Sequence, residues 1–226
     1  MKMFYVPLIK PEDWQQFLAD PEKHWRDEFS AKSLAFAWQN AQGFPLKVKS
    51  VFDKSVIKQV HSIELLMGFP EYKVPLPGGA RASQNDIFLL CRNEDGLLSI
   101  MVEGKVEESF GPLVEEWLNE RHFSTHERFE YLTEILNLKN KDVNKIRYQL
   151  LHRTASAIIE AKRFCSRQAM VLVHSFSKSN TSFSDYEKYL SIYGVKGKID
   201  SVTEPINFSD VNVYFAWVND DFPKYR

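Results

Sequence analysis

Residues 83–106 read SQNDIFLLCRNEDGLLSIMVEGKV, and this stretch decides the fold. Its two apolar runs flank Asn93-Glu94-Asp95-Gly96, a turn sequence whose glycine suits a positive φ. The pattern therefore predicts a β-hairpin. If the turn centres between Glu94 and Asp95, Asp86 at the start of the first strand falls opposite Glu103 at the end of the second. A bulge at Gly96 would shift this register by one residue.

Three charged side chains gather at the open end of the predicted hairpin. Paired residues share a face of the sheet, and Lys105 shares it too because it lies two residues after Glu103. Carboxylates that lie close together repel each other, and a divalent cation removes that cost. The pattern is typical of a Mg²⁺ or Mn²⁺ site in which the lysine assists attack on a phosphodiester. The alternative is a salt-bridged hairpin end, with Lys105 paired to Glu103 or Glu107 at the surface.

Composition limits the classes of protein that need be considered. The 226 residues are 44% hydrophobic and 14% aromatic, which favours a globular chain with a sizeable core. The 29 basic and 30 acidic residues give a net charge of −1, so any nucleic-acid binding must rely on a local site. Two cysteines without metal-ligand spacing, and the absence of an apolar leader or membrane-length run, predict a cytoplasmic protein that does not enter a membrane.

Apolar periodicity predicts alternating helices and strands along the rest of the chain. The near-continuous apolar run at 169–176 predicts a central strand covered on both faces. The helix at 54–67 places Glu64 at the edge of its apolar face. The elements expected outside the hairpin are helices over 14–18, 31–41, 54–67, 113–120, 128–138, 145–164 and 183–193, and strands over 72–76, 169–176 and 211–217.

Polar side chains are concentrated in the first two turns of the helix at 145–164. Arg147, Gln149, His152 and Arg153 lie there on a helix that leads into the central strand. Such a concentration is consistent either with a site or with ordinary exposure to solvent. His174, inside the strand that follows, is a second candidate, although a histidine at the edge of the core is the simpler interpretation.

The predicted order helix–strand–strand–strand–helix–strand, with Asp86 on the second strand and Glu103-Gly104-Lys105 on the third, resembles the PD-(D/E)XK superfamily of restriction-endonuclease-like nucleases. The blocks SAKSLA, VEGK and YQLLHR make the chain similar to an uncharacterised bacterial family within that superfamily. The likeness covers residues 54–176. Asn85 stands where the family motif has a proline, which is a departure from the pattern.

The resemblance implies an αβββαβ core with a mixed central sheet flanked by helices, within an α/β (α+β) single domain over residues 1–226. Residues 1–50 would form an N-terminal helical elaboration, and 177–226 would add a C-terminal helix and strand. It also implies a catalytic set of Asp86, Glu103 and Lys105, with Mg²⁺ or Mn²⁺ held by Asp86, Glu103 and the helical Glu64. Gln149 and Arg153 would contact the substrate phosphate.

The function implied is metal-dependent phosphodiester hydrolysis, with DNA as the nucleic-acid partner and assembly as a homodimer left open. One alternative is a catalytically silent module of this fold that binds nucleic acid or protein in a bacterial defence or repair system. Another is an α/β enzyme that uses Arg153 and His174 on a small phosphorylated substrate. The sequence has no glycine-rich phosphate loop, nucleophile elbow or dinucleotide fingerprint in support of that last alternative.

Overall fold

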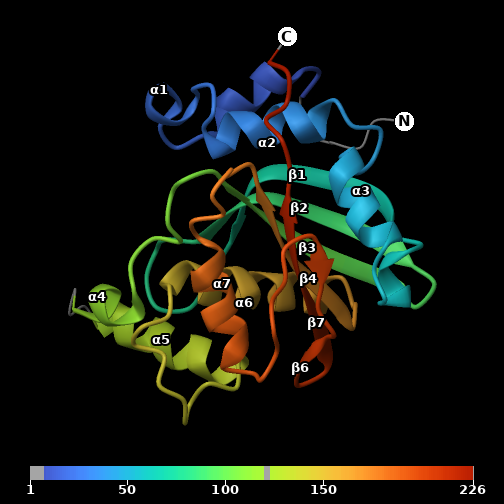
Figure 1. The fold of residues 1–226 in the computed structure, drawn as a ribbon. Helices are drawn as coiled ribbons and strands as arrows, with labels where there is room; N and C mark the ends of the chain where they lie inside the picture. The colour runs from blue at the N-terminus through green and yellow to red at the C-terminus, as the bar shows by residue number, and fades with distance from the viewer. Residues whose placement is uncertain (1–7, 120–122, 226) are drawn as a thin grey trace.

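The computed structural model describes residues 8–119 and 123–225. At its centre is a mixed sheet of seven strands in the order β1-β2-β3-β4-β7-β5, with β6 also paired to β7 (Figure 1). The strands are β1 (Glu64–Val74), β2 (Ser83–Asn93), β3 (Gly96–Lys105), β4 (Gln168–Ser175), β5 (Ser201–Val202), β6 (Ile206–Phe208) and β7 (Val211–Asn219).

Strand direction changes in the middle of the sheet. β1, β2 and β3 form an antiparallel meander, whereas β3, β4 and β7 run parallel to one another. Parallel neighbours need a crossover connection, and helices between β3 and β4 and between β4 and β7 supply it. The prediction of a mixed central sheet flanked by helices is confirmed.

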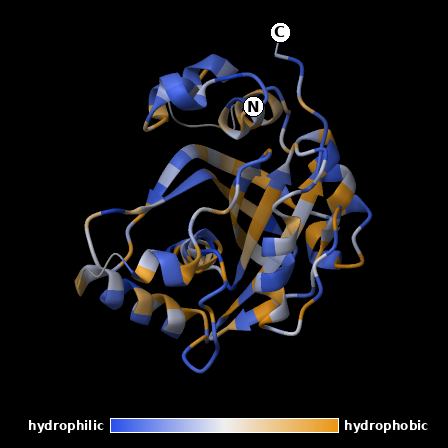
Figure 2. Cartoon of the chain, turned by 60° about the vertical axis from the view of Figure 1, so that its left-hand side comes forward, coloured by the Kyte–Doolittle hydropathy of each residue, from blue (hydrophilic) through white to orange (hydrophobic). Residues whose placement is uncertain are grey.

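Helices cover both faces of the sheet. The N-terminal helices pack on one face, and α5, α6 and α7 pack on the other, so each face buries its own apolar core (Figures 1 and 2). None of the described helices is long and apolar enough to cross a membrane. The helices are η1 (Pro11–Phe17), α1 (Pro21–His24), α2 (Ser30–Gln39), α3 (Leu46–Asp53), η2 (Lys58–Val60), α4 (Val114–Leu118), α5 (Phe123–Ile135), α6 (Tyr148–Arg163) and α7 (Phe183–Ser191).

The strongest sequence patterns form the expected elements. The hairpin β2–β3 turns between Asn93 and Gly96, and Gly96 has φ 117° as the turn requires. Every residue of β4 is buried, as its apolar run indicated, because helices cover both sides of a central parallel strand. Helix α6 lies within the predicted 145–164, with its apolar stripe on the core.

The helix predicted over 54–67 is wrong. That stretch contains only the short η2, and β1 begins at Glu64 and extends well before the predicted strand start at Tyr72. Val56, expected on the buried helix face, is 86% exposed. The helical spacing of the apolar residues 56, 60, 63 and 67 is fortuitous, because the first three precede β1 and only Met67 lies in it, after a register shift at Leu65.

Candidate functional site

The site lies at the open end of the hairpin, where β2 begins and β3 ends. The ladder pairs Asn93 with Gly96 and continues without a bulge to Ile87 and Val102, so the next position places Asp86 opposite Glu103. The predicted register is therefore confirmed. The backbone N–H of Gly104 also donates to Asp86 Oδ2 at 2.8 Å, which fixes this carboxylate against β3.

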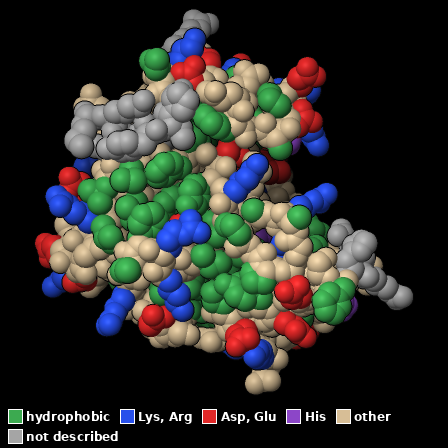
Figure 3. All heavy atoms as spheres, turned by 180° about the vertical axis from the view of Figure 1, so that it is seen from behind, with side chains coloured by type: hydrophobic (Ala, Val, Ile, Leu, Met, Phe, Trp, Pro, Cys, Tyr) green, Lys and Arg blue, Asp and Glu red, His purple; other side chains and the backbone are tan. Residues whose placement is uncertain are grey.

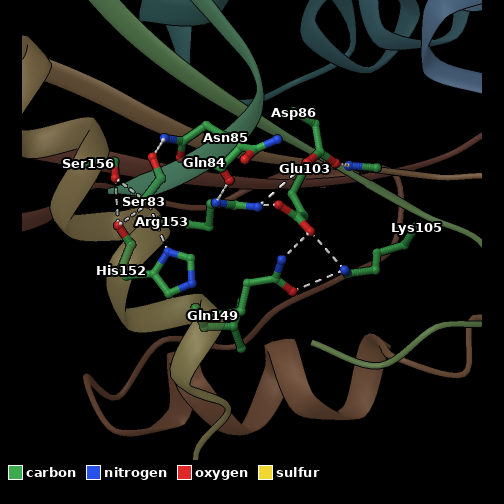
Figure 4. A network of polar contacts seen from close by, with 12 residues as sticks. Ser83, Gln84, Asn85, Asp86, Glu103, Lys105, Gln149, His152, Arg153 and Ser156 are labelled. Carbon is green, nitrogen blue, oxygen red and sulfur yellow. Dashed lines mark hydrogen bonds and ion pairs between the residues drawn. The ribbon is translucent and has the colours of Figure 1, made fainter. Parts of the chain in front are cut away.

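Glu103, Lys105 and Gln149 form a closed triangle of hydrogen bonds (Figure 4). Lys105 Nζ donates to Glu103 Oε1 at 2.8 Å and to Gln149 Oε1 at 3.1 Å. Gln149 Nε2 donates to the same Glu103 oxygen at 2.7 Å. Gln149 reaches the hairpin because it lies in the first turn of α6, which packs across β3. The ammonium of Lys105 also lies 4.6 Å from the ring centre of Phe110.

Arg153, one turn further along α6, binds both strands of the hairpin. Its guanidinium donates to Glu103 Oε2 and to the carbonyl of Gln84, and it lies 3.5 Å from Asp86 Oδ1 (Figure 4). The side chains of Arg153 and Glu103 are only 6% and 4% exposed, whereas that of Asp86 is 24% exposed. Arg153 and Lys105 therefore form buried ion pairs with Glu103, and Asp86 is the carboxylate left open to the cleft.

The two carboxylates titrate in opposite directions because their neighbours differ. Burial alone would raise the pKa of Glu103, but the adjacent charges of Arg153 and Lys105 outweigh it and lower the pKa. Burial and the charge of Glu103 raise the pKa of Asp86 well above its usual value, and Arg153 offsets only part of this effect. The site thus contains a carboxylate that lacks a full compensating cation.

Glu64 does not belong to this site, contrary to the prediction. It begins β1 at the far end of the sheet, where its carboxylate accepts from Arg92 across the strands and both side chains are more than half exposed. Asp86 is six residues from Arg92 along β2, which corresponds to about 20 Å. The prediction fails because residues 54–67 do not form a helix. Glu64 instead begins β1, at the end of the sheet opposite to the site.

Glu71 is the carboxylate that the sequence reasoning missed. It lies between the paired positions Pro70–Ile87 and Tyr72–Asn85, opposite Asp86. Gln84 Nε2 donates to Glu71 Oε2 at 2.5 Å. Burial raises the pKa of Glu71 to about 7, and the charge of Arg153 counteracts this while that of Glu103 adds to it. If residues 64–74 are interpreted as a strand paired with β2, Glu71 is expected beside Asp86.

A polar cluster of α6 and β2 supports the site from behind. His152 Nδ1 lies 2.8 Å from Ser83 Oγ, which also accepts a hydrogen bond from Ser156 Oγ at 2.8 Å (Figure 4). Burial, with the cationic Arg153, Arg128 and Lys105 nearby, lowers the pKa of His152 well below its usual value. His152 is therefore neutral at physiological pH and positions the N-terminal part of α6.

Two other positions from the sequence also have defined places. Asn85, where the superfamily motif has proline, donates from its side-chain amide to the carbonyls of Tyr72 and Ser83 and fastens β2 to β1. His174 lies on the opposite face of the sheet from Arg153, between Trp38 and Asp220. A pocket shared by Arg153 and His174 is thereby excluded.

The oxygen donors of the site determine whether it can hold a divalent cation. Among residues 8–119 and 123–225, no group of three or more His, Cys, Asp or Glu side chains is placed to hold a metal. Asp86 and Glu103 supply two carboxylates, which suits Mg²⁺ because this ion keeps several waters and takes further ligands from a substrate phosphate. Asp86 Oδ1 has one long contact, with Arg153 at 3.5 Å, whereas both oxygens of Glu103 are bonded to Lys105 or Arg153 and would have to be shared. Asp86 and Glu103 therefore fit the ion, provided that Glu103 shares an oxygen with it.

Comparison with known families places the chain. A family described as a domain of unknown function, DUF6946, matches residues 7–222. The chain belongs to the DUF6946 family. No curated protein and no solved structure matches it.

Proposed function

We propose that this DUF6946 protein is a divalent-metal-dependent phosphodiester hydrolase that acts on DNA, built on a restriction-endonuclease-like core. The observation that carries the proposal is the placement of Asp86 opposite Glu103, with Lys105 on the same face and hydrogen-bonded to Glu103 at 2.8 Å. With α4 and α5 inserted between β3 and α6, the order β1, β2, β3, α6, β4 is also compatible with the strand–strand–strand–helix–strand part of that core.

Each side chain of the site has a distinct role in this proposal. Mg²⁺ or Mn²⁺ held by Asp86 and Glu103 would neutralise charge on the phosphodiester and its transition state. Lys105 orients the attacking water and donates to the phosphate oxygen on which negative charge grows. Gln149 fixes the orientation of the Lys105 and Glu103 side chains through its hydrogen bonds to both. Arg153 keeps the Glu103 carboxylate ionised and directs it towards the cleft.

Calorimetric titration with Mn²⁺ tests the metal site. The wild type is expected to bind the ion, and Glu103→Gln to lose binding because an amide oxygen is a weaker ligand than a carboxylate. Glu64→Gln is the matched control, because it removes an exposed carboxylate at the other end of the same sheet. Circular dichroism establishes that each variant is folded. Equal binding by the wild type and Glu103→Gln would exclude this site.

A catalytically silent module that binds nucleic acid or protein is the second candidate. The observation in its favour is that Arg153 and Lys105 already occupy both oxygens of Glu103. A structural ion-pair cluster needs no metal. Absence of Mn²⁺ binding, both alone and in the presence of DNA, would favour this candidate over the hydrolase.

A further inference from the structure

The cleft in front of Asp86 and Glu103 has walls that the hairpin does not supply. Its volume is about 980 Å³, and its floor is formed by the hairpin end and the start of α6. Residues 23–24 and 27–30, from the N-terminal helical layer, form the facing wall together with Phe222 of the C-terminal tail. In Figure 1 this layer lies at the same end of the molecule as the C-terminus. A cleft of this size matches a small ligand or a short segment of chain.

The facing wall is held firmly in place by the C-terminal tail. The backbone N–H of Glu28 donates to the hydroxyl of Tyr225 at 3.1 Å, and Ser33 Oγ lies 2.9 Å from the same hydroxyl. The ring of Phe222 stacks on Phe176, with centres 6.2 Å apart. These contacts join the N-terminal layer to the C-terminal tail beside the site.

Aromatic rings line two sides of this cleft. Phe29, at the start of α2, is 41% exposed and has the guanidinium of Arg26 5.9 Å from its ring centre. Tyr148, at the start of α6, lines the other side and stacks on Trp117 with ring centres 3.9 Å apart. Phe29 is the exposed ring of the two and can form a stacking platform for an unpaired base, whereas Tyr148 is half-buried against Trp117.

The charges around the cleft favour stacking over phosphate contacts. Six carboxylates and three lysines are among its described lining residues. On the part of the surface drawn in colour in Figure 3, Lys and Arg side chains are scattered among carboxylates around a broad apolar area. Duplex DNA is held mainly by Lys and Arg contacts to its phosphates. A cleft with few cations and an exposed aromatic ring is better suited to contacts with unpaired bases than to contacts with a run of duplex phosphates.

We propose that the cleft takes an unpaired strand of DNA, with one base stacked on Phe29 and the adjoining phosphate directed at Asp86 and Glu103. This inference rests on the proposed function, because the carboxylates need a divalent cation before a phosphate can approach them. Phe29 is then a specificity-determining residue that selects unpaired over paired DNA.

Fluorescence anisotropy with Ca²⁺ as the cation tests the proposal in the full-length protein. The probes are a fluorescein-labelled oligothymidylate and a blunt duplex of equal length. The single strand should bind at least tenfold more tightly than the duplex. Phe29→Ala should weaken single-strand binding about tenfold, the effect expected for loss of one base-stacking contact, and Phe29→Trp should restore it. Phe123→Ala is the matched control, because Phe123 is 87% exposed at the start of α5 and lies outside the cleft.

The outcomes separate this inference from the hydrolase proposal. Equal or tighter binding of the duplex, or no effect of Phe29→Ala, would overturn the single-strand inference while leaving the metal site intact. Failure of both probes to bind, in a protein that binds Mn²⁺ by calorimetry, would overturn the choice of DNA as substrate. Failure to bind Mn²⁺ as well would overturn the hydrolase proposal itself.

Discussion

Glu71 of β1 lies opposite Asp86 of β2, at the strand ends that form the candidate site. Glu71 also has a positive φ of 51°, a backbone conformation that non-glycine residues seldom adopt. Strain of this kind persists where the surrounding structure imposes it, and it is concentrated at functional sites. The acidic end of the sheet therefore contains three neighbouring carboxylates, from Glu71, Asp86 and Glu103, against the two cations Lys105 and Arg153.

The raised pKa of Glu71 should make stability depend on pH. Between the usual glutamate value near 4.5 and about 7, the folded state holds a proton that the unfolded state has released, so stability falls as pH rises. Glu71→Gln removes this penalty, because a neutral amide can still accept from Gln84. We expect the variant to match the wild type near pH 5 and to exceed its unfolding free energy by on the order of 1–3 kcal/mol at pH 8.

Urea denaturation in metal-free buffer at the two pH values measures this difference. Glu64→Gln is again the control, because its exposed carboxylate should give no pH-dependent change. A Glu71→Gln variant that loses stability at pH 8 would show that Glu71 is held ionised, and the excess of carboxylates at the site would then be wrong.

The Glu103–Arg153 pair should show strong coupling, because both side chains are almost fully buried. Arg153→Met leaves Glu103 with Lys105 and Gln149 only, and we expect it to destabilise the protein by about 3–5 kcal/mol. Glu103→Gln should also destabilise, since Arg153 then lacks a carboxylate. The double variant should lose less than the two single losses combined. Additive losses in urea denaturation would indicate that the two charges are solvated separately.

The local sequence patterns are sufficient to predict the hairpin β2–β3, but not the neighbouring strand β1. The turn at Asn93–Gly96 and the alternation of β2 and β3 fixed the register, and with it the meeting of Asp86, Glu103 and Lys105. The start of α6 followed from periodicity, so Gln149 and Arg153 could be anticipated.

The edge strand β1 could not be recognised in the same way, because pairing with β2 and an irregular register decide its conformation. The sequence therefore predicts Glu64 for the site and does not indicate Glu71. The residues that face the site across the cleft also could not be predicted from the sequence. Their position depends on contacts between the two ends of the chain, such as Glu28 with Tyr225.

Gly104, between Glu103 and Lys105, allows α2 to pack directly on the strand that carries the site. A Cβ at Gly104 would lie 2.4 Å from Leu34 Cδ1 and 2.8 Å from Leu34 Cγ, and Leu34 is only 1% exposed. We expect Gly104→Ala to destabilise the protein by roughly 1–3 kcal/mol through overpacking. Leu34→Ala in the same chain should recover part of the loss, because it frees the space. Lack of such recovery in thermal or urea denaturation would place the strain elsewhere.

Lys105→Ala tests the proposed chemistry. The substitution leaves Glu103 bound by Arg153 and Gln149, so the fold and Mn²⁺ binding should persist. Cleavage of single-stranded DNA should fall by about 10²–10³-fold or more, because a donor aimed at the developing negative charge is lost. Lys178→Ala is the matched control, since Lys178 is an exposed lysine that lines the same cleft. If Lys105→Ala cleaves as fast as Lys178→Ala and the wild type, the lysine has no part in the reaction. The buried pair of Lys105 and Glu103 is then a structural contact.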